Sequence, residues 1–137
     1  MIHAIAQHLT TILFDRWSMT SVPILYDNQP NIDVSDSRSW CRFSIRFGQQ
    51  SNATIGTTKA VDQKGRVIMQ IFTKHEIGSS DALTITENVS NIFNNLRILT
   101  NDYSLSVVEP MIDTYDDEDW FQTNISFKLN CRYNVND

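Results

Sequence analysis

The last part of the chain is one long alternating segment that predicts a single β-strand. Between Phe121 and Tyr133, apolar or small side chains alternate with polar ones almost without interruption. One side of the pattern consists of Phe121, Thr123, Ile125, Phe127, Leu129, Cys131 and Tyr133. A period of two is typical of an antiparallel strand with one buried and one solvated face.

The length of this strand constrains the fold further. With Trp120 and Asn134 included, it would extend about 50 Å at roughly 3.4 Å per residue. A compact sphere of this chain length measures only about 37 Å across. We therefore expect a strand that either coils strongly or leaves the core to meet another molecule.

Length and charge exclude several classes of protein. The 137 residues fit one domain, residues 1–137, large enough to bury about two thirds of its unfolded surface. A formal net charge of −5 argues against an extended basic surface for duplex DNA but leaves a local basic patch open.

Cys41 and Cys131 lie in register with the apolar sides of alternating strands, which indicates buried free thiols in a reducing compartment. We expect no signal peptide and no membrane contact, because the apolar start of the chain lacks a basic region.

Two segments have the apolar spacing of amphipathic helices. The first, with Ile5 and Leu9, should end near Trp17, and the second should be capped by Ser80 and end near residues 94–97. The second helix is expected to bury Ile85, Val89, Ile92, Phe93 and Leu96.

Shorter strands are predicted between and after the helices. They cover Pro23 to Tyr26, Cys41 to Phe47, Arg66 to Lys74 and Ser104 to Ile112. We expect a polar loop at residues 27–39, the end of a strand at Gly48 and a turn over residues 62–65. Glu109 and Pro110 should disturb the strand that contains them, which places it at a sheet edge or a bulge.

This order of elements predicts an α+β fold, a mostly antiparallel sheet with two helices packed on one face. Matching the helical stripes to the apolar strand faces gives the expected core. It comprises Ile5, Leu9, Leu13, Phe43, Ile45, Ile85, Val89, Ile92, Ile125, Phe127 and Leu129.

An acidic segment is the main candidate for chemistry. The stretch from Asp113 to Asp119 holds five carboxylates, hard oxygen ligands of the kind that Ca²⁺ and Mg²⁺ prefer. Its spacing does not match an EF-hand loop. The carboxylates are equally those of a solvated loop, or of a surface that faces a charged partner. We expect no cofactor, no metal and no catalytic residue, because His3, His8 and His75 lack a shared ligand geometry and no nucleophile motif occurs.

Aromatic and basic residues interleave in the strand that contains Arg42 and Arg46. The strand period sends these arginines to the face opposite Phe43 and Phe47, unlike the cooperating charge and stacking of a single-strand-binding platform. Trp40 shares this outer face, and Trp120 stands beside the acidic segment. We interpret these two tryptophans, with Asp116, Asp117, Glu118 and Asp119, as candidate interface or lumen residues.

The order of segments resembles the small tail terminator and tail-completion proteins of long-tailed bacteriophages. The resemblance covers most of the chain, and no segment of it is a diagnostic motif. It rests on the first helix, VPILYDNQP from Val22, WCRFSIRF from Trp40, QKGRVIMQIF from Gln63, the Gly78–Ser79 entry to the second helix and the long closing strand after an acidic turn.

The resemblance implies a structural virion protein in the tail or neck, assembled in the host cytoplasm, and no active site. A homo-hexameric ring would cap the tail tube protein, end its polymerisation and join it to the head-closure (stopper) protein, while DNA passes through without specific binding. Three alternatives stay open. They are another neck or head–tail adaptor protein, a metal-dependent enzyme that uses residues 113–119, and a monomeric adaptor that binds a partner through an exposed strand.

Overall fold

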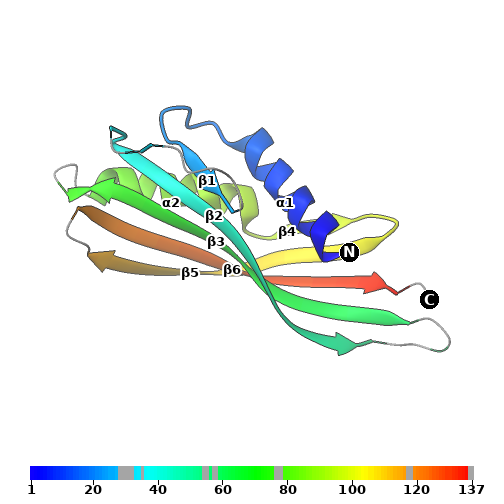
Figure 1. Ribbon diagram of the computed structural model, residues 1–137. Coiled ribbons are helices and arrows are strands. Elements are labelled where there is room, and N and C mark those ends of the chain that lie inside the picture. Colours follow the sequence, from blue (N-terminus) through cyan, green and yellow to red (C-terminus); the bar gives the residue numbers. More distant parts are fainter. Residues whose placement is uncertain are drawn as a thin grey trace.

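Figure 1 shows a computed structural model in which a coiled sheet carries two helices on one side. It describes residues 1–27, 33–34, 36–53, 56, 59–75, 79–116 and 119–135. The elements are α1 (Ile2–Arg16), β1 (Ile24–Tyr26), β2 (Ser39–Asn52), β3 (Ala60–Lys74), α2 (Ser79–Phe93), β4 (Leu96–Leu99), β5 (Tyr103–Asp116) and β6 (Trp120–Asn134). The predicted α+β class, with two helices on one face, is confirmed.

The strands that the structure describes form one six-stranded sheet with the order β1-β2-β3-β6-β5-β4. All neighbours are antiparallel except β1, which runs parallel to β2. In the centre, β3 and β6 pair along their whole lengths, from Ala60 opposite Asn134 to Lys74 opposite Trp120. The predicted closing strand thus has the expected bounds, and Figure 1 shows how it fits, because the long strands coil strongly and their far ends lie beyond the helices.

The core lies between the helices and one face of the sheet. α1 buries Ile5, Leu9 and Leu13, and Phe93 of α2 lies between Phe43 and Phe127, with ring centroids 5.7 and 6.0 Å away. Every residue of the predicted core is buried except Ile45, which is half-buried and packs at the margin. The match follows from periodicity, because helical and strand spacings each select one apolar face.

Two β-bulges shift the register of the long strands. One lies in β2 between Phe47 and Gln50, and the other lies in β5 between Val108 and Met111. Glu109, inside the second bulge, has φ 55°, a left-handed backbone conformation that is uncommon outside glycine. The predicted disturbance at Glu109 and Pro110 is confirmed.

Two predicted strand breaks are wrong. β2 does not stop at Gly48 but continues to Asn52, because the bulge accommodates Gly48 and the side chain of Gln63 donates a hydrogen bond to its carbonyl oxygen at 3.0 Å. Residues 62–65 form no turn and lie inside β3. The glycine there has another purpose, because a Cβ at Gly65 would lie 2.5 Å from the carbonyl oxygen of Arg46. Gly65 therefore permits close approach of two strands rather than a chain reversal.

Three boundaries also differ from expectation. Ser80 lies inside α2 rather than capping it, and α2 ends at Phe93. Leu96 belongs to β4, a strand that the sequence reasoning missed because Leu96 continues the helical spacing. Residues 113–116 are part of β5 rather than a loop. All four side chains from residue 113 to residue 116 are exposed, so this part of β5 needs no alternation of apolar and polar residues.

Candidate assembly surfaces

The face of the sheet opposite the helices, called the open face below, concentrates the basic residues of the chain. The strand registers place eight of the eleven Lys and Arg residues on it. They are Arg42, Arg46, Lys64, Arg66, Lys74, Arg97, Lys128 and Arg132. A chain of net charge −5 thus has one basic side.

Three of these cations are compensated by carboxylates. Arg46 pairs with Asp27 at 2.8 Å and Lys128 pairs with Glu109 at 2.7 Å. Arg132 donates two hydrogen bonds to Asp62, at 2.7 and 3.0 Å. These hydrogen bonds lower the pKa of Asp62, since they favour its charged form. The same effect of Lys128 lowers the pKa of Glu109.

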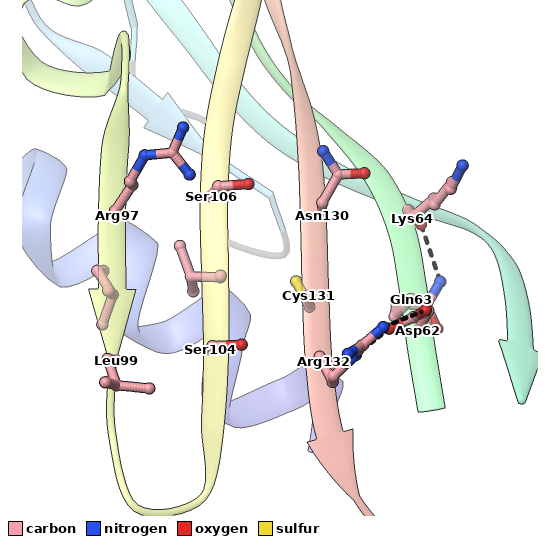
Figure 2. Close-up of a pocket in the computed structure, with 12 residues that line it drawn as sticks. Asp62, Gln63, Lys64, Arg97, Leu99, Ser104, Ser106, Asn130, Cys131 and Arg132 are labelled. Carbon is pink, nitrogen blue, oxygen red and sulfur yellow. Dashed lines mark hydrogen bonds and ion pairs between the residues drawn. The ribbon is translucent and has the colours of Figure 1, made fainter. Parts of the chain in front are cut away.

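A cavity of about 520 Å³ opens on this face across four neighbouring strands. Figure 2 shows Arg97, Ser106, Asn130 and Lys64 in one row from β4 to β3, and Leu99, Ser104, Arg132 and Asp62 in the next row. We call this cavity the basic hollow. The side chains of Lys64 and Arg97 make no ion pair with any residue that the structure describes. Cations beside neutral hydrogen-bonding groups suit an anionic ligand group such as a carboxylate.

An aromatic cluster lies at the other end of the open face. Trp40 stacks on Phe72 with ring centroids 4.1 Å apart, and Trp120 meets Trp40 edge to face at 6.1 Å. Arg42 lies over Trp40, and Lys74 lies over Trp120. Trp40 is buried, and its indole Nε1 has no hydrogen-bond partner among the residues described. The structure thus brings together the two tryptophans that the sequence singled out, and their interface role stays a prediction.

The predicted acidic residues lie at this same end of the sheet. Asp113 and Asp116 at the end of β5 are exposed, as is Asp119 before β6. Asp116 lies 3.3 Å from the ring of His75. Asp117 and Glu118 lie outside the described residues. Within the described residues, no group of three His, Cys, Asp or Glu side chains is placed to hold a metal ion.

The edge formed by β5 is a feature that the sequence reasoning located only in part. β4 pairs with residues 104–107 alone, so the rest of β5 has no outer neighbour among the described strands. Three large apolar side chains on this segment are about half exposed: Met111 at 48%, Ile112 at 55% and Tyr115 at 52%. Pro110 was the available signal, because proline is tolerated at sheet edges. No sequence pattern predicts that the apolar side chains are exposed. Alternation alone would assign Ile112 to the core.

The two cysteines are buried and free, as expected. Burial raises the pKa of both the Cys41 and the Cys131 thiol to about 12. A thiol with so high a pKa is a poor nucleophile at neutral pH. Their location fits a packing role.

In the part of the chain that the structure describes, neither helix is both long and apolar enough to cross a membrane.

Two solved structures are similar in fold. A protein without a functional name has 14% identity, a TM-score of 0.59 and coverage of 96% of this chain and 99% of its own. A chain from the virion of a native gene transfer agent particle has 14% identity, a TM-score of 0.52 and coverage of 93% and 84%. A search of curated protein sequences gave no match.

The described part of the chain thus has an α+β fold with long sheet edges that lack an outer neighbour. Its basic residues gather on one face, and it offers surfaces suited to contacts with other proteins. The profile of the phage tail terminator protein family matches residues 2–128, and the chain belongs to that family. It is therefore a structural protein of the phage tail, located in the virion and associated with other tail components. The resemblance seen in the sequence is confirmed.

Proposed function

We propose that this chain forms a hexameric ring that caps the tail tube, ends its polymerisation and joins it to the head-closure protein. Assembly would take place in the host cytoplasm, and DNA would pass through the ring without specific binding. The observation that carries the proposal, beside the family, is that long parts of β2 and β5 have no outer neighbour among the strands that the structure describes. A free edge presents unpaired backbone groups that a second chain can use.

The two edges are complementary in direction. β1 pairs only with residues 41–43 of β2, so residues 44–52 have no outer neighbour among the described strands, and residues 109–116 of β5 form the free edge on the other side. Because β2, β3, β6 and β5 alternate in direction, β2 and β5 run antiparallel. A second copy in the same orientation would therefore offer its β2 to β5 of the first as an antiparallel neighbour. Such a head-to-tail contact generates a ring when its rotation closes.

The exposed apolar residues of β5 support the same proposal. Met111 and Tyr115 lie on the open face and Ile112 on the helix-covered face, as their partners Ser126, Gln122 and Ile125 show. A contact along β5 would cover apolar side chains on both faces at once. Trp40 and Trp120 lie at the same end, where we propose that they anchor a partner, with half-buried Trp120 making the contact and buried Trp40 supporting it from below.

A substitution in the free edge tests the ring. Ile112→Lys should prevent assembly, because a lysine there would have to be desolvated in the contact, whereas the monomer should keep its fold. Phe14→Lys on α1 is the matched control, since Phe14 is also exposed, at 73%. Light scattering, with and without purified tail tubes, measures the outcome. Wild-type protein that stays monomeric under both conditions and leaves tubes growing would refute the proposal.

The acidic residues from the end of β5 to the start of β6 have a separate role in the proposed function. Asp116, Asp117, Glu118 and Asp119 would face either the DNA passage or a basic neighbouring protein, without holding a catalytic metal. In a passage, carboxylates repel phosphate, and at a docking surface they attract Lys and Arg and speed association. Replacing the four by Asn or Gln should leave the thermal unfolding midpoint nearly unchanged and impair assembly or infectivity. Calorimetry measures whether the protein binds Ca²⁺ or Mg²⁺. Tight binding that the replacement abolishes would contradict the proposal and favour the enzyme alternative.

A further inference from the structure

The centre of the open face holds more positive charge than the chain itself compensates. Arg46, Arg66 and Lys128 are successive partners across β2, β3 and β6. Like charges directly opposite one another on adjacent strands are destabilising. Asp27 and Glu109 compensate Arg46 and Lys128. Arg66 donates a hydrogen bond to the Ser126 hydroxyl at 3.5 Å and forms no ion pair with the described residues. The adjoining row contributes Lys64 and Arg97. An external anion would relieve this repulsion.

The chain carries suitable anions at the opposite end of the same sheet. Asp113 and Asp116 are exposed, and the side chain of Asp116 is 77% accessible. Ser106, in the basic hollow, precedes Asp116 by ten positions of β5, about 33 Å at roughly 3.3 Å per residue. These carboxylates cannot reach the hollow of their own chain. They can reach the hollow of another copy.

We propose that the basic hollow of one copy binds the end of β5 of a second copy, which we call its acidic end and which carries Asp113 and Asp116. The two aspartates project from opposite faces of that strand, as their partners Asn124 and Phe121 show, so that one would face Lys64 and the other Arg97. The inference rests on the proposed ring and deepens it, since it names the basic neighbour of the acidic end. Each copy has one hollow and one acidic end at different places, so the contact is heterologous and repeats around a ring. Complementary charge of this kind orients the subunits and speeds their association.

Duplex DNA fits the hollow less well than a carboxylate surface. Duplex DNA presents about one negative charge per 1.7 Å of helix axis. A surface that binds it therefore needs a dense row of cations that are not already paired with carboxylates. Here Arg46, Lys128 and Arg132 are already paired with carboxylates. Within the hollow, Ser106 and Asn130 separate Arg97 and Lys64, its two cations that form no ion pair with the described residues. A few aspartates match two cations and two neutral hydrogen-bonding groups better than a continuous polyanion does.

Charge reversal tests the contact. The variant Lys64→Glu with Arg97→Glu should raise the protein concentration needed for half assembly at least about tenfold, and so should Asp113→Lys with Asp116→Lys. An equimolar mixture of the two variants should assemble again, because each reversed surface then meets its complement on the other copy. Arg16→Glu is the control for a general effect of charge, because Arg16 is an exposed residue of α1 far from both proposed contact surfaces in the sequence. Thermal unfolding verifies that each variant is folded.

The outcomes separate this inference from the proposed function. Reversed variants that assemble and cap tubes like wild type would overturn the inference and leave the ring intact. Failure of the mixture to recover would also overturn it. Wild-type binding of a fluorescent DNA duplex that the hollow variant loses, with assembly unchanged, would assign the hollow to nucleic acid instead. Wild-type protein that neither assembles nor caps tubes would refute the proposed function itself.

Discussion

The helix-covered face and the open face are built from the same strands but differ in burial and in charge. Along β6, Ile125, Phe127 and Leu129 are at most 1% exposed beneath the helices. The residues that alternate with them, including Lys128 and Asn130, are polar and lie on the open face. One alternating strand therefore serves two purposes, since one face supplies the energy of folding and the other is available for contacts.

The two faces also stabilise the protein by different physics. Burial of apolar side chains is worth about 1.5–3 kcal/mol for each large residue, whereas exposed ion pairs contribute about 0–1 kcal/mol and are screened by salt. Substitutions on the helix-covered face should therefore dominate stability. Substitutions on the open face should act mainly on assembly.

The largest expected effect comes from Phe127→Ala. The ring is fully buried and lies against Phe93, so its removal should lower the free energy of unfolding by about 3–5 kcal/mol. Asn130→Ala, on the open face of the same strand, should change it by less than about 0.5 kcal/mol. Urea denaturation of both variants measures the difference. Equal losses would mean that the two faces are not energetically distinct.

An intermediate effect is expected from Gly65→Ala. The added Cβ would meet the carbonyl oxygen of Arg46 at 2.5 Å, and relieving this overlap should cost about 1–3 kcal/mol. Gly48→Ala is the matched control, because the nearest atom to its Cβ would be the Lys64 carbonyl oxygen at 3.7 Å. Thermal unfolding compares the two. If Gly48→Ala proves the more costly, the close approach of β2 and β3 is misplaced.

The smallest effect should come from Asp62→Asn on the open face. Arg132 lowers the pKa of Asp62 in the folded protein, so the stabilisation is present above the unfolded value of about 3.9. It is lost as the pH falls through the lowered folded value. The unfolding midpoint should drop slightly at pH 7, and the difference from wild type should vanish at acid pH. About 1 M salt should also reduce it at pH 7, and a difference that persists in both conditions would contradict an exposed ion pair.

Much of the helix-covered face could be predicted because its signals are local. The spacing of Ile5, Leu9 and Leu13 specifies a helical face, and the alternation around Phe127 specifies a strand face, whatever lies elsewhere in the chain. The far ends of the strands were harder. Residues 49–52 and 113–116 are solvated on both sides, so neither period nor apolar content distinguishes them from loops.

The candidate surfaces were predictable residue by residue but not as arrangements. Alternation places Arg42 and Arg46 on a solvated outer face and singles out Trp40 and Trp120 as candidate anchors. It gives no signal for Arg97, because Leu96 continues the helical spacing and hides the start of β4. The basic hollow is invisible without that strand.

By itself, the sequence determined the α+β class, the two helical stripes, the bounds of the closing strand and which side chains share a face. These follow from intervals of two, three or four residues, over which the backbone geometry is fixed. Only the tertiary structure decided that Arg97 and Lys64 lie in one row and that Gly65 lies against Arg46. It also decided that residues 109–116 of β5 have no outer neighbour among the described strands. Pairing of distant strands depends on register and bulges, and these are selected by the packing of the whole sheet rather than by any local pattern.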